Sequence, residues 1–410
     1  MRCRHCSAQL SHNFLDLGFS PPSNAYLTTE DLTRPEKYYP LKVMVCNQCW
    51  LVQTEDYTQA DELFDAEYSY FSSTSKSWLD HAENFSKRMI EEMGLCGNSF
   101  VIEIASNDGY LLKNFVRENI PCLGIEPTAS TAEAAEALGI PVLREFFGEQ
   151  LGRRLSADGR QADLIVGNNV YAHVPNINDF TCGLKAALRV GGTITLEFPH
   201  LMRLIESSQF DTIYHEHFSY LSLSVVDKIF TSCGLRIFDV EKLNTHGGSL
   251  RIFGCHADDD RPVRGSVKEL IDEEIGNGVK DLRLYQDFQF KVDQIKDNLL
   301  TFLIEQKRKN VKVVAYGAAA KGCTLLNYAG VKPDLLPIVF DASISKQNKY
   351  LPGSHIPIKA PGELRDMAVD LILILPWNIK EEVIDQLSFV ADKGAKFVVA
   401  VPEIKILQPS

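Results

Sequence analysis

From residue 100 onward, short apolar segments alternate with stretches of helical periodicity, and this alternation constrains the fold more than any other feature. The strand-like segments are FVIEIA (100–105), CLGIEP (122–127), PVLREF, DLIVGNN (163–169) and GGTITLEF, and the helical stretches include YLLKNFVREN and TASTAEAAEALG. Strands that alternate with helices form βαβ units and a mainly parallel sheet covered on both faces. LRIFDVEKL and SLRIFGCH, joined by NTHGG, predict an antiparallel pair that closes this sheet. The predicted fold class is therefore α/β.

A second α/β alternation begins at VKVVAYG (311–317) and continues through LLPIVFD, DLILILP and AKFVVAV. The intervening residues 256–310 carry no strand signal. Within them, VKDLRLYQDFQFKVDQIKDNLLTFLIEQKRK has apolar positions at helical spacing and a basic last turn, which the helix dipole favours. We expect a helical connection between two α/β regions. A chain of 410 residues that is 45% hydrophobic is long enough for about two to four domains.

Two Cys-x-x-Cys pairs near the N-terminus predict a metal site. Cys3, Cys6, Cys46 and Cys49 place four thiolates on two tight turns, which suits tetrahedral structural zinc. Such a site leaves no open coordination position, so we assign it no catalysis. Four unligated thiols are the alternative. We expect the other six cysteines to be unpaired core residues: 96, 122, 182, 233, 255 and 323.

Charge and composition exclude several classes of protein. A net charge of −12 argues against extensive phosphate contacts, and we expect no nucleic-acid partner. No apolar run approaches the ~20 residues of a membrane helix, so we expect no membrane partner. The N-terminal MRCRHCSAQL lacks the apolar core of a signal peptide, which favours a cytoplasmic location with reduced thiols. The sequence carries no signal for an oligomeric state.

Polar residues follow the predicted strands at the edge where α/β sheets bind ligands. After the first strand comes EIASNDG (103–109), which lacks the glycines that a pyrophosphate needs. It suits a ligand with an amino-acid part and a nucleoside part. Glu126 can accept both ribose hydroxyls, Phe146 or Phe147 can cover an adenine, and Asn168 and Asn169 end the fourth strand. Each acid alone also fits a helix cap.

The segment 213–218, IYHEHF, gathers a phenol, a carboxylate and two imidazoles. Imidazole exchanges a proton near neutral pH, and a neighbouring Glu or Tyr can orient it. In a strand-like stretch His215 would point away from Tyr214 and Glu216, which predicts a structural role for it. A metal site there is not expected, because the histidines lack the i, i+4 separation of a helical pair. A polar loop with satisfied histidines is the alternative.

The middle region resembles the class I S-adenosylmethionine (SAM)-dependent methyltransferases. The whole chain resembles the sugar C-methyltransferases, through the four-cysteine module, IEIASNDG, NNVYAHVPN, IYHEHF and THGGSLR. Those enzymes methylate C-3′ of a nucleotide-linked 4-keto-deoxyhexose. The resemblance implies a zinc-binding module (1–70), a methyltransferase domain (71–255), the helical connection (256–310) and a C-terminal Rossmann-like domain (311–410). It implies SAM as cofactor, held by Glu103, Ala105, Asn107, Asp108, Gly109, Tyr110, Glu126, Phe146, Phe147, Asn168 and Asn169.

The same resemblance implies the residues of a sugar pocket. Tyr214, Glu216 and His217 would line it, with His217 as the general base that removes a proton beside the ketone. His173 and an upstream tyrosine, Tyr68 or its neighbour Tyr70, would face it, and Tyr214 or His173 would donate to the developing enolate. His246 in THGGS is a further candidate, although a turn residue fits equally well.

The C-terminal domain carries a degenerate phosphate loop, GAAAKG, with Gly317, Lys321 and Gly322, and Asp341 ends the next strand. Spacing alone permits NAD there. The resemblance instead assigns this domain to the nucleotide part of a dTDP-linked sugar, with Lys321 neutralising a phosphate. Three alternatives stay open: an RNA methyltransferase, an NAD-dependent sugar-nucleotide oxidoreductase and a binding protein without catalysis.

Overall fold

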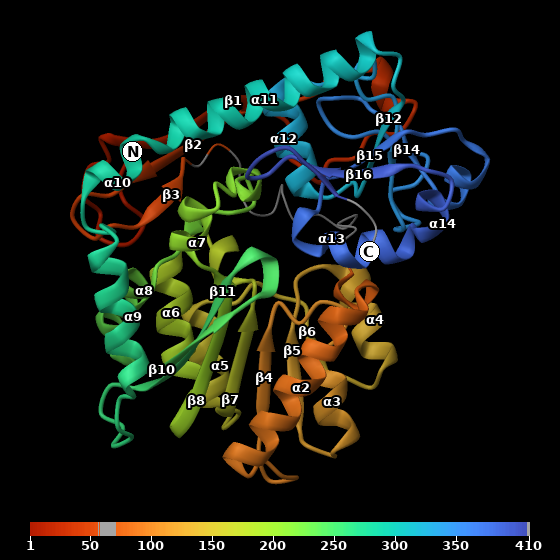
Figure 1. The fold of residues 1–410 in the computed structure, drawn as a ribbon. Helices are drawn as coiled ribbons and strands as arrows, with labels where there is room; N and C mark the ends of the chain where they lie inside the picture. Colours follow the sequence, from red (N-terminus) through yellow and green to blue (C-terminus); the bar gives the residue numbers. More distant parts are fainter. Residues whose placement is uncertain (56, 58–70, 408–410) are drawn as a thin grey trace.

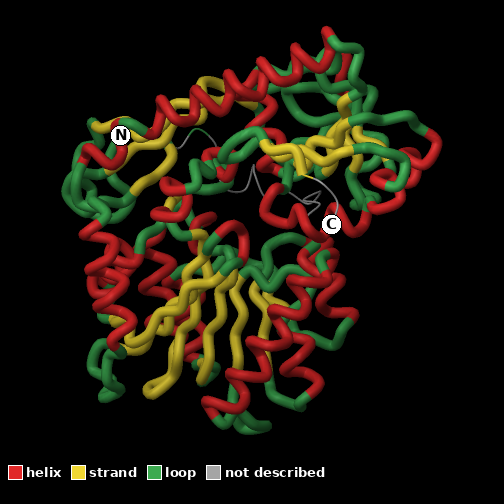
Figure 2. Tube along the Cα trace, in the orientation of Figure 1, coloured by secondary structure: helices red, strands yellow, loops and turns green. Residues whose placement is uncertain are grey.

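The computed structural model describes residues 1–55, 57 and 71–407 of the chain (Figure 1). The candidates Tyr68 and Tyr70 lie outside these residues. The described residues form a four-stranded, a seven-stranded and a six-stranded sheet. Figure 2 shows the seven-stranded sheet at the bottom of the view and the six-stranded sheet above it, to the right.

The seven-stranded sheet has the strand order of a class I methyltransferase. Numbered by chain position within this sheet, its strands run 3-2-1-4-5-7-6 across it, and the seventh is antiparallel to both neighbours. The fold prediction is thus confirmed, including the antiparallel pair at the sheet's end. In spatial order the strands are β10 (Leu235–Leu243), β11 (Ser249–His256), β8 (Leu188–Pro199), β7 (Ala162–Asn168), β4 (Val101–Ile104), β5 (Cys122–Ile125) and β6 (Val142–Leu143).

Helices cover both faces of this sheet because successive strand residues alternate between two apolar cores. Val101 of β4 packs with α2, α3 and α4, whereas Ile102 packs with α5, α6 and α8 on the opposite face. These helices are α2 (Lys76–Met93), α3 (Leu112–Arg117), α4 (Ala129–Ala137), α5 (Glu149–Ala157), α6 (Ile177–Ala187) and α8 (Leu223–Ser232). The strand edge that faces the rest of the molecule carries the loops predicted to bind ligands (Figure 1).

The N-terminal sheet consists of β1 (His12–Ser20), β2 (Tyr39–Val45), β3 (Val52–Thr54) and β9 (Ser219–Tyr220). Its fourth strand comes from far along the chain, since β9 directly follows IYHEHF and pairs with β3 through Val52 and Tyr220. Thr54 adds two bonds to this junction: its backbone N–H donates to Phe218 O at 3.2 Å and its hydroxyl to His217 O at 3.2 Å. The four-cysteine region and the histidine segment therefore flank strands of the same sheet.

Helices connect the two α/β regions. The stretch expected as one helix is divided at Asp287 into α10 (Leu282–Gln286) and α11 (Phe288–Arg308), and α9 (Gly265–Gly276) precedes them. Figure 1 shows α11 lying across the top of the molecule, over both the N-terminal and the C-terminal sheets. It packs on β1, where the rings of Phe14 and Phe288 stack with their centroids 4.7 Å apart.

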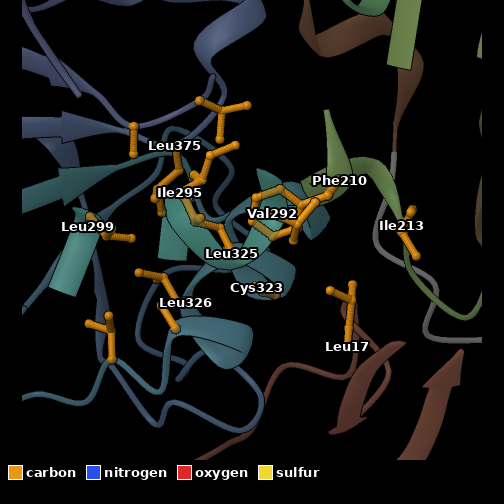
Figure 3. Close-up of a cluster of buried hydrophobic side chains, with 14 of the residues drawn as sticks. Leu17, Phe210, Ile213, Val292, Ile295, Leu299, Cys323, Leu325, Leu326 and Leu375 are labelled. Atoms are coloured by element: carbon orange, nitrogen blue, oxygen red, sulfur yellow. The ribbon is translucent and has the colours of Figure 1, made fainter. Parts of the chain in front are cut away.

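The six-stranded sheet has the order β14-β13-β12-β15-β16-β17, with only β17 antiparallel to its neighbour. Its strands are β12 (Val313–Tyr316), β13 (Val339–Phe340), β14 (Ile358–Lys359), β15 (Leu371–Ile374), β16 (Lys396–Val399) and β17 (Lys405–Leu407), with helices α12 (Ala320–Ala329), α13 (Lys380–Gln386) and α14 (Ser388–Ala391). One apolar core joins this sheet, α11 and the N-terminal sheet. Figure 3 shows Leu325 of α12 close to Val292 and Phe210, and Leu326 and Ile213 belong to the same cluster.

The cysteines outside the metal site differ partly from expectation. Cys182 on α6 and Cys233 after α8 form a disulfide with their Cα atoms 5.1 Å apart, because these neighbouring helices bring together two positions distant in sequence. Cys96 is exposed, whereas Cys122, Cys255 and Cys323 are buried as predicted. Among the described residues, none of the helices combines the length and apolarity required to span a bilayer.

Candidate active site

The four predicted zinc ligands lie together. Their sulfur atoms all lie within 4.8 Å of one another, and the Cys3–Cys49 and Cys6–Cys46 sulfurs are each 3.5 Å apart. Four sulfurs each ~2.3 Å from a central zinc ion would be separated by distances of this size. The donor set and its spacing therefore fit Zn²⁺, and the protein has a structural zinc site.

The two Cys-x-x-Cys turns have the same backbone geometry. In each, the residue four positions after the first cysteine has a positive φ, 61° at Ser7 and 73° at Trp50. Its N–H donates to the carbonyl of that first cysteine, at 2.9 Å for Cys3 and 2.8 Å for Cys46. The Gln53 amide also donates to Cys3 Sγ at 3.2 Å. The backbone thus holds both pairs of sulfurs in place.

The loop after β4 turns sharply at the edge of the seven-stranded sheet. Ala105, Asn107 and Gly109 all have positive φ, at 55°, 49° and 77°. Glu126, at the end of β5, accepts from the backbone N–H groups of Asn107 at 3.0 Å and Thr128 at 2.9 Å. Burial raises the pKa of Glu126, and these bonds oppose the shift. The carboxylate therefore joins two adjacent strand-end loops, and its remaining lone pairs can still accept ligand hydroxyls.

Other predicted cofactor residues lie around this loop. Glu103 is fully buried in β4, and burial raises the pKa of its carboxyl well above the ordinary value, with hydrogen bonding by Tyr110 opposing the shift. Asp108 accepts from the Ser73 N–H at 3.1 Å through one oxygen, and within the described residues its other oxygen is buried without a hydrogen-bond partner. Asn168 ends the adjacent strand β7. Such an edge, with a buried carboxylate oxygen still to be satisfied, fits the polar groups of SAM.

The two phenylalanines expected near the adenine have different surroundings. Phe147 is partly buried and packs edge-on against Phe180 of α6, with the ring centroids 5.2 Å apart. Phe146 is 54% exposed. Phe146 is therefore the more exposed of the two rings.

IYHEHF forms a turn rather than the expected strand-like stretch. The His217 N–H donates to Tyr214 O at 2.9 Å, which closes a turn over residues 214–217. This brings the rings of Tyr214 and His217 together, with their centroids 4.0 Å apart and their planes tilted by 34°. His215 lies on the other side, against β2, and its Nε2 donates to Pro40 O at 3.2 Å. The side-chain directions predicted for a strand do not apply, although His215 does point away from the others.

His217 is buried and held in one tautomer. Its Nδ1 lies 2.9 Å from Thr212 O, and because a carbonyl oxygen only accepts, Nδ1 carries the hydrogen and Nε2 has the free lone pair. The His173 ring lies edge-on at 4.5 Å between centroids. Burial lowers the pKa of His217 well below its ordinary value and that of His173 to about 4. Both imidazoles are therefore neutral at pH 7.

Two strained residues meet beside this group. Asn169, after β7, and His246, in the turn between β10 and β11, have φ angles of 55° and 53°, and Asn169 Nδ2 lies 3.0 Å from His246 Nε2. Positive φ is uncommon for residues other than glycine and persists where surrounding contacts enforce it, often at functional sites. Burial lowers the pKa of His246 to about 4.

A buried ionic network under this contact was not predicted. Glu197 Oε2 lies 2.8 Å from His81 Nε2 and accepts from Arg251 at 2.7 Å, and Glu197 Oε1 accepts from Thr245 at 2.8 Å. These partners hold the pKa of Glu197 at about 2 despite burial. The Trp78 ring stacks on His81 and meets His246 edge-on. The signal for this network in the sequence was one acidic residue, Glu197, in the otherwise apolar segment GGTITLEF.

The loop after β12 and the helix α12 that follows it lie close to the histidine turn. Asp341 accepts from the N–H groups of Ala318 at 2.7 Å and Ser343 at 2.8 Å, so its carboxylate shapes the loop after β12. Lys321, near the start of α12, donates to Asn378 Oδ1 at 2.9 Å. Gly317 has a φ of 95°, and a Cβ there would lie 2.3 Å from Pro376. A Cβ at Gly322 would lie 2.8 Å from the Leu375 side chain, so both glycines allow close packing against the loop after β15.

The seven-stranded sheet, with its polar carboxyl edge beside the group of His173, Tyr214 and His217, is that of a SAM-dependent methyltransferase. Residues 244–402 match the C-methyltransferase C-terminal domain, and residues 3–64 match a zinc binding domain of methyltransferases. The chain is 32% identical over 405 residues to the C-methyltransferase NovU of Streptomyces niveus, covering 99% of this chain and 96% of that protein. The chain belongs to this family of C-methyltransferases.

The similarity to solved structures is more distant. Magnesium protoporphyrin IX methyltransferase from Synechocystis with bound SAH is 12% identical, with a TM-score of 0.34 over 43% of this chain and 81% of that one. The PH0226 protein from Pyrococcus horikoshii is 11% identical, with a TM-score of 0.36 over 49% of this chain and all of that one (100%). These similarities are too distant to bear on function.

Proposed function

We propose that this C-methyltransferase acts on C-3′ of a nucleotide-linked 4-keto-6-deoxyhexose, with dTDP as the nucleotide, and that His217 is the general base. The observation that carries this proposal is the hydrogen bond from His217 Nδ1 to Thr212 O. It leaves Nε2 of a neutral imidazole as the only proton acceptor of the ring, in a buried position beside Tyr214 and His173. A base held in this way can remove the hydrogen beside a ketone.

The proposed reaction balances as follows. The C–H bond at C-3′ breaks, its proton passes to His217 Nε2, and the electron pair moves to the ketone oxygen as an enolate. SAM, held by the loops after β4, β5 and β7, would supply an electrophilic methyl group to the enolate carbon, and S-adenosylhomocysteine would leave as the methyl–sulfur bond breaks. Tyr214 and neutral His173 are the donors we assign to the enolate oxygen, because donors aimed at developing charge supply much of the catalysis in such steps.

We further propose a division of labour along the chain. Residues 71–255 would hold SAM through the loops after β4, β5 and β7, with Glu126 at the ribose. Residues 311–410 would hold the nucleotide, with Lys321 next to a phosphate. Residues 1–70 would hold zinc, and 256–310 would connect the two α/β regions. Asn24 donates to Glu216 at 2.7 Å, which supports a pocket shared by residues 1–70 and 71–255.

The test separates proton removal from methyl transfer. The protein is incubated in D2O with a dTDP-4-keto-6-deoxyhexose and S-adenosylhomocysteine, which has no methyl to give, and deuterium at C-3′ is followed by NMR. We expect exchange with the wild-type protein and none with His217→Asn, and a C-3′-methylated sugar when SAM is supplied. If methyl transfer occurs but deuterium exchange at C-3′ does not depend on His217, His217 is not the base. If several keto-sugar nucleotides give neither exchange nor methyl transfer, the proposed substrate class is wrong. A protein that binds NADH and not S-adenosylhomocysteine would belong to the oxidoreductase alternative.

A further inference from the structure

His217, the proposed base, is bonded to a segment that residues of the C-terminal region contact. Thr212, whose carbonyl accepts from His217, ends the short 3-10 helix η4 (Phe210–Thr212). Two hydrogen bonds fix this segment from the C-terminal region. Trp377 Nε1 donates to Asp211 Oδ2 at 2.7 Å, and the Thr324 hydroxyl donates to Ile213 O at 2.9 Å.

Apolar packing reinforces this hold. Phe210 and Ile213 are fully buried in the core cluster that contains α12 residues Leu325 and Leu326 (Figure 3). The residues on either side of Thr212 thus pack on the C-terminal region. The orientation of the Thr212 carbonyl, and with it that of His217, depends on α12 and on the loop that carries Trp377.

The indole of Trp377 is itself held in position. Lys321 Nζ lies over its ring, 4.6 Å from the centroid. Gly247 packs against the same ring, since a Cβ there would lie 2.5 Å from the Trp377 indole. Asp211 is fully buried, so its carboxylate depends on donors such as the indole N–H to remain in the core.

We propose that Asp211, held by the indole N–H of Trp377, is a positioning residue for His217, so that the C-terminal part of the chain sets the orientation of the base. This inference rests on the proposed role of His217. Asp211 does not touch the reacting atoms; it acts through the adjacent Thr212 carbonyl. A base displaced by about an ångström loses up to ~100-fold in rate, so the effect belongs in kcat.

The experiment is a double-mutant cycle on the full-length protein. Trp377→Phe removes the donor and keeps a ring beneath Lys321, Asp211→Ala removes the acceptor, and Asp211→Asn keeps an acceptor oxygen. We expect Trp377→Phe and Asp211→Ala each to lower kcat by ~10-fold, and the double variant to lose no more than either alone. The KM for the sugar nucleotide and the affinity for S-adenosylhomocysteine should stay within about two-fold, and Asp211→Asn should stay within about three-fold in kcat.

The matched control is Tyr316→Phe, which removes one buried side-chain donor, the Tyr316 hydroxyl bonded to Gln386 at 2.9 Å, far from η4 in sequence. It should leave kcat unchanged. The proposal is overturned if Trp377→Phe keeps wild-type kcat, if its loss appears in KM alone, or if the two single losses multiply.

A second readout does not depend on activity. In ¹⁵N-histidine-labelled protein, the His217 ring signals, assigned with His217→Asn, should show hydrogen on Nδ1, and Trp377→Phe should broaden or shift them. Unchanged ring signals would overturn the positioning role. If His217→Asn keeps activity while Trp377→Phe still shifts these signals, the base assignment has failed and the structural coupling stands.

Discussion

Asn24 donates its side-chain N–H to Glu216 Oε1 over 2.7 Å, although the two residues are 192 positions apart. The same N-terminal segment reaches the C-terminal loop, where the Tyr26 hydroxyl donates to Ala318 O at 2.6 Å. Residues 24–26 therefore lie between the histidine turn and the loop after β12. A carboxylate in the proposed sugar pocket thus depends on the fold of the region that carries the zinc ligands.

Loss of zinc should consequently reduce catalysis and spare the cofactor site. In Cys46→Ser/Cys49→Ser, zinc measured by atomic spectroscopy should be lost, because two of four ligands are gone and metal binding contributes to the folding of such modules. Methyl transfer should fall by ~10-fold or more as the placement of Glu216 is relaxed. Binding of S-adenosylhomocysteine, which we assign to the loops after β4 and β5, should persist.

The control for this change is Cys96→Ser, an exposed thiol outside the four-cysteine group, which should alter neither zinc content nor rate. Retention of zinc by the double variant would refute the four-thiolate site. Full activity in a zinc-free protein would refute the link through Asn24.

How far the sequence predicts this molecule depends on whether a feature is local. Alternating apolar strands and helices predicted the sheet, because side-chain periodicity is a property of neighbouring residues. The geometry of the histidine turn was missed because it depends on β3, through the bonds of Thr54 to His217 and Phe218. Asp211 and Trp377 carry no motif, and only the tertiary fold brings them together. The Cys182–Cys233 disulfide was missed for the same reason.

The Glu126 carboxylate should make a large contribution to the affinity for the cofactor. Glu126→Ala removes the acceptor for two backbone N–H groups and, in our proposal, for the ribose hydroxyls. A hydrogen bond to a charged group contributes about 1.5–3 kcal/mol, so the affinity for S-adenosylhomocysteine should fall by ~10- to 100-fold in calorimetry. Glu133→Ala on α4, where an exposed carboxylate pairs with Arg144, is the matched control and should bind normally. Unchanged affinity in Glu126→Ala would leave this carboxylate only its backbone role.

The buried imidazoles should make a destabilising contribution in mild acid, opposed by Glu103, whose raised pKa has the opposite effect. Burial lowers the pKa of His173 and His246 to about 4 from the ordinary 6.5, and that of His217 shifts in the same direction. Above the ordinary value both the folded and the unfolded chain hold these rings neutral, so this contribution is constant. As the pH falls below it, the unfolded chain takes up protons that the folded protein does not, and the free energy of unfolding decreases.

The slope should approach on the order of 1 kcal/mol per pH unit for each such histidine. Thermal unfolding at pH about 7.5 and about 5.5 measures it, and His246→Gln should make the dependence shallower because that ring no longer titrates in the unfolded chain. A pH dependence in His246→Gln that is as steep as that of the wild type would contradict the assignment of a neutral buried ring at this position.

The two histidines of the turn offer the sharpest comparison, since they are two positions apart in sequence and different in surroundings. His217→Asn should lower kcat by ~100-fold or more, the scale for losing a general base, with S-adenosylhomocysteine binding kept. His215→Asn should stay within about three-fold, because its ring faces β2, where it donates to Pro40 O, and an asparagine amide retains a donor. Steady-state kinetics on both variants measures the difference. Equal losses in the two variants would mean that the turn is needed as a structure and that Nε2 of His217 has no special role. A loss confined to His217→Asn would assign proton removal to the His217 ring, whose tautomer is set by the bond to Thr212 O.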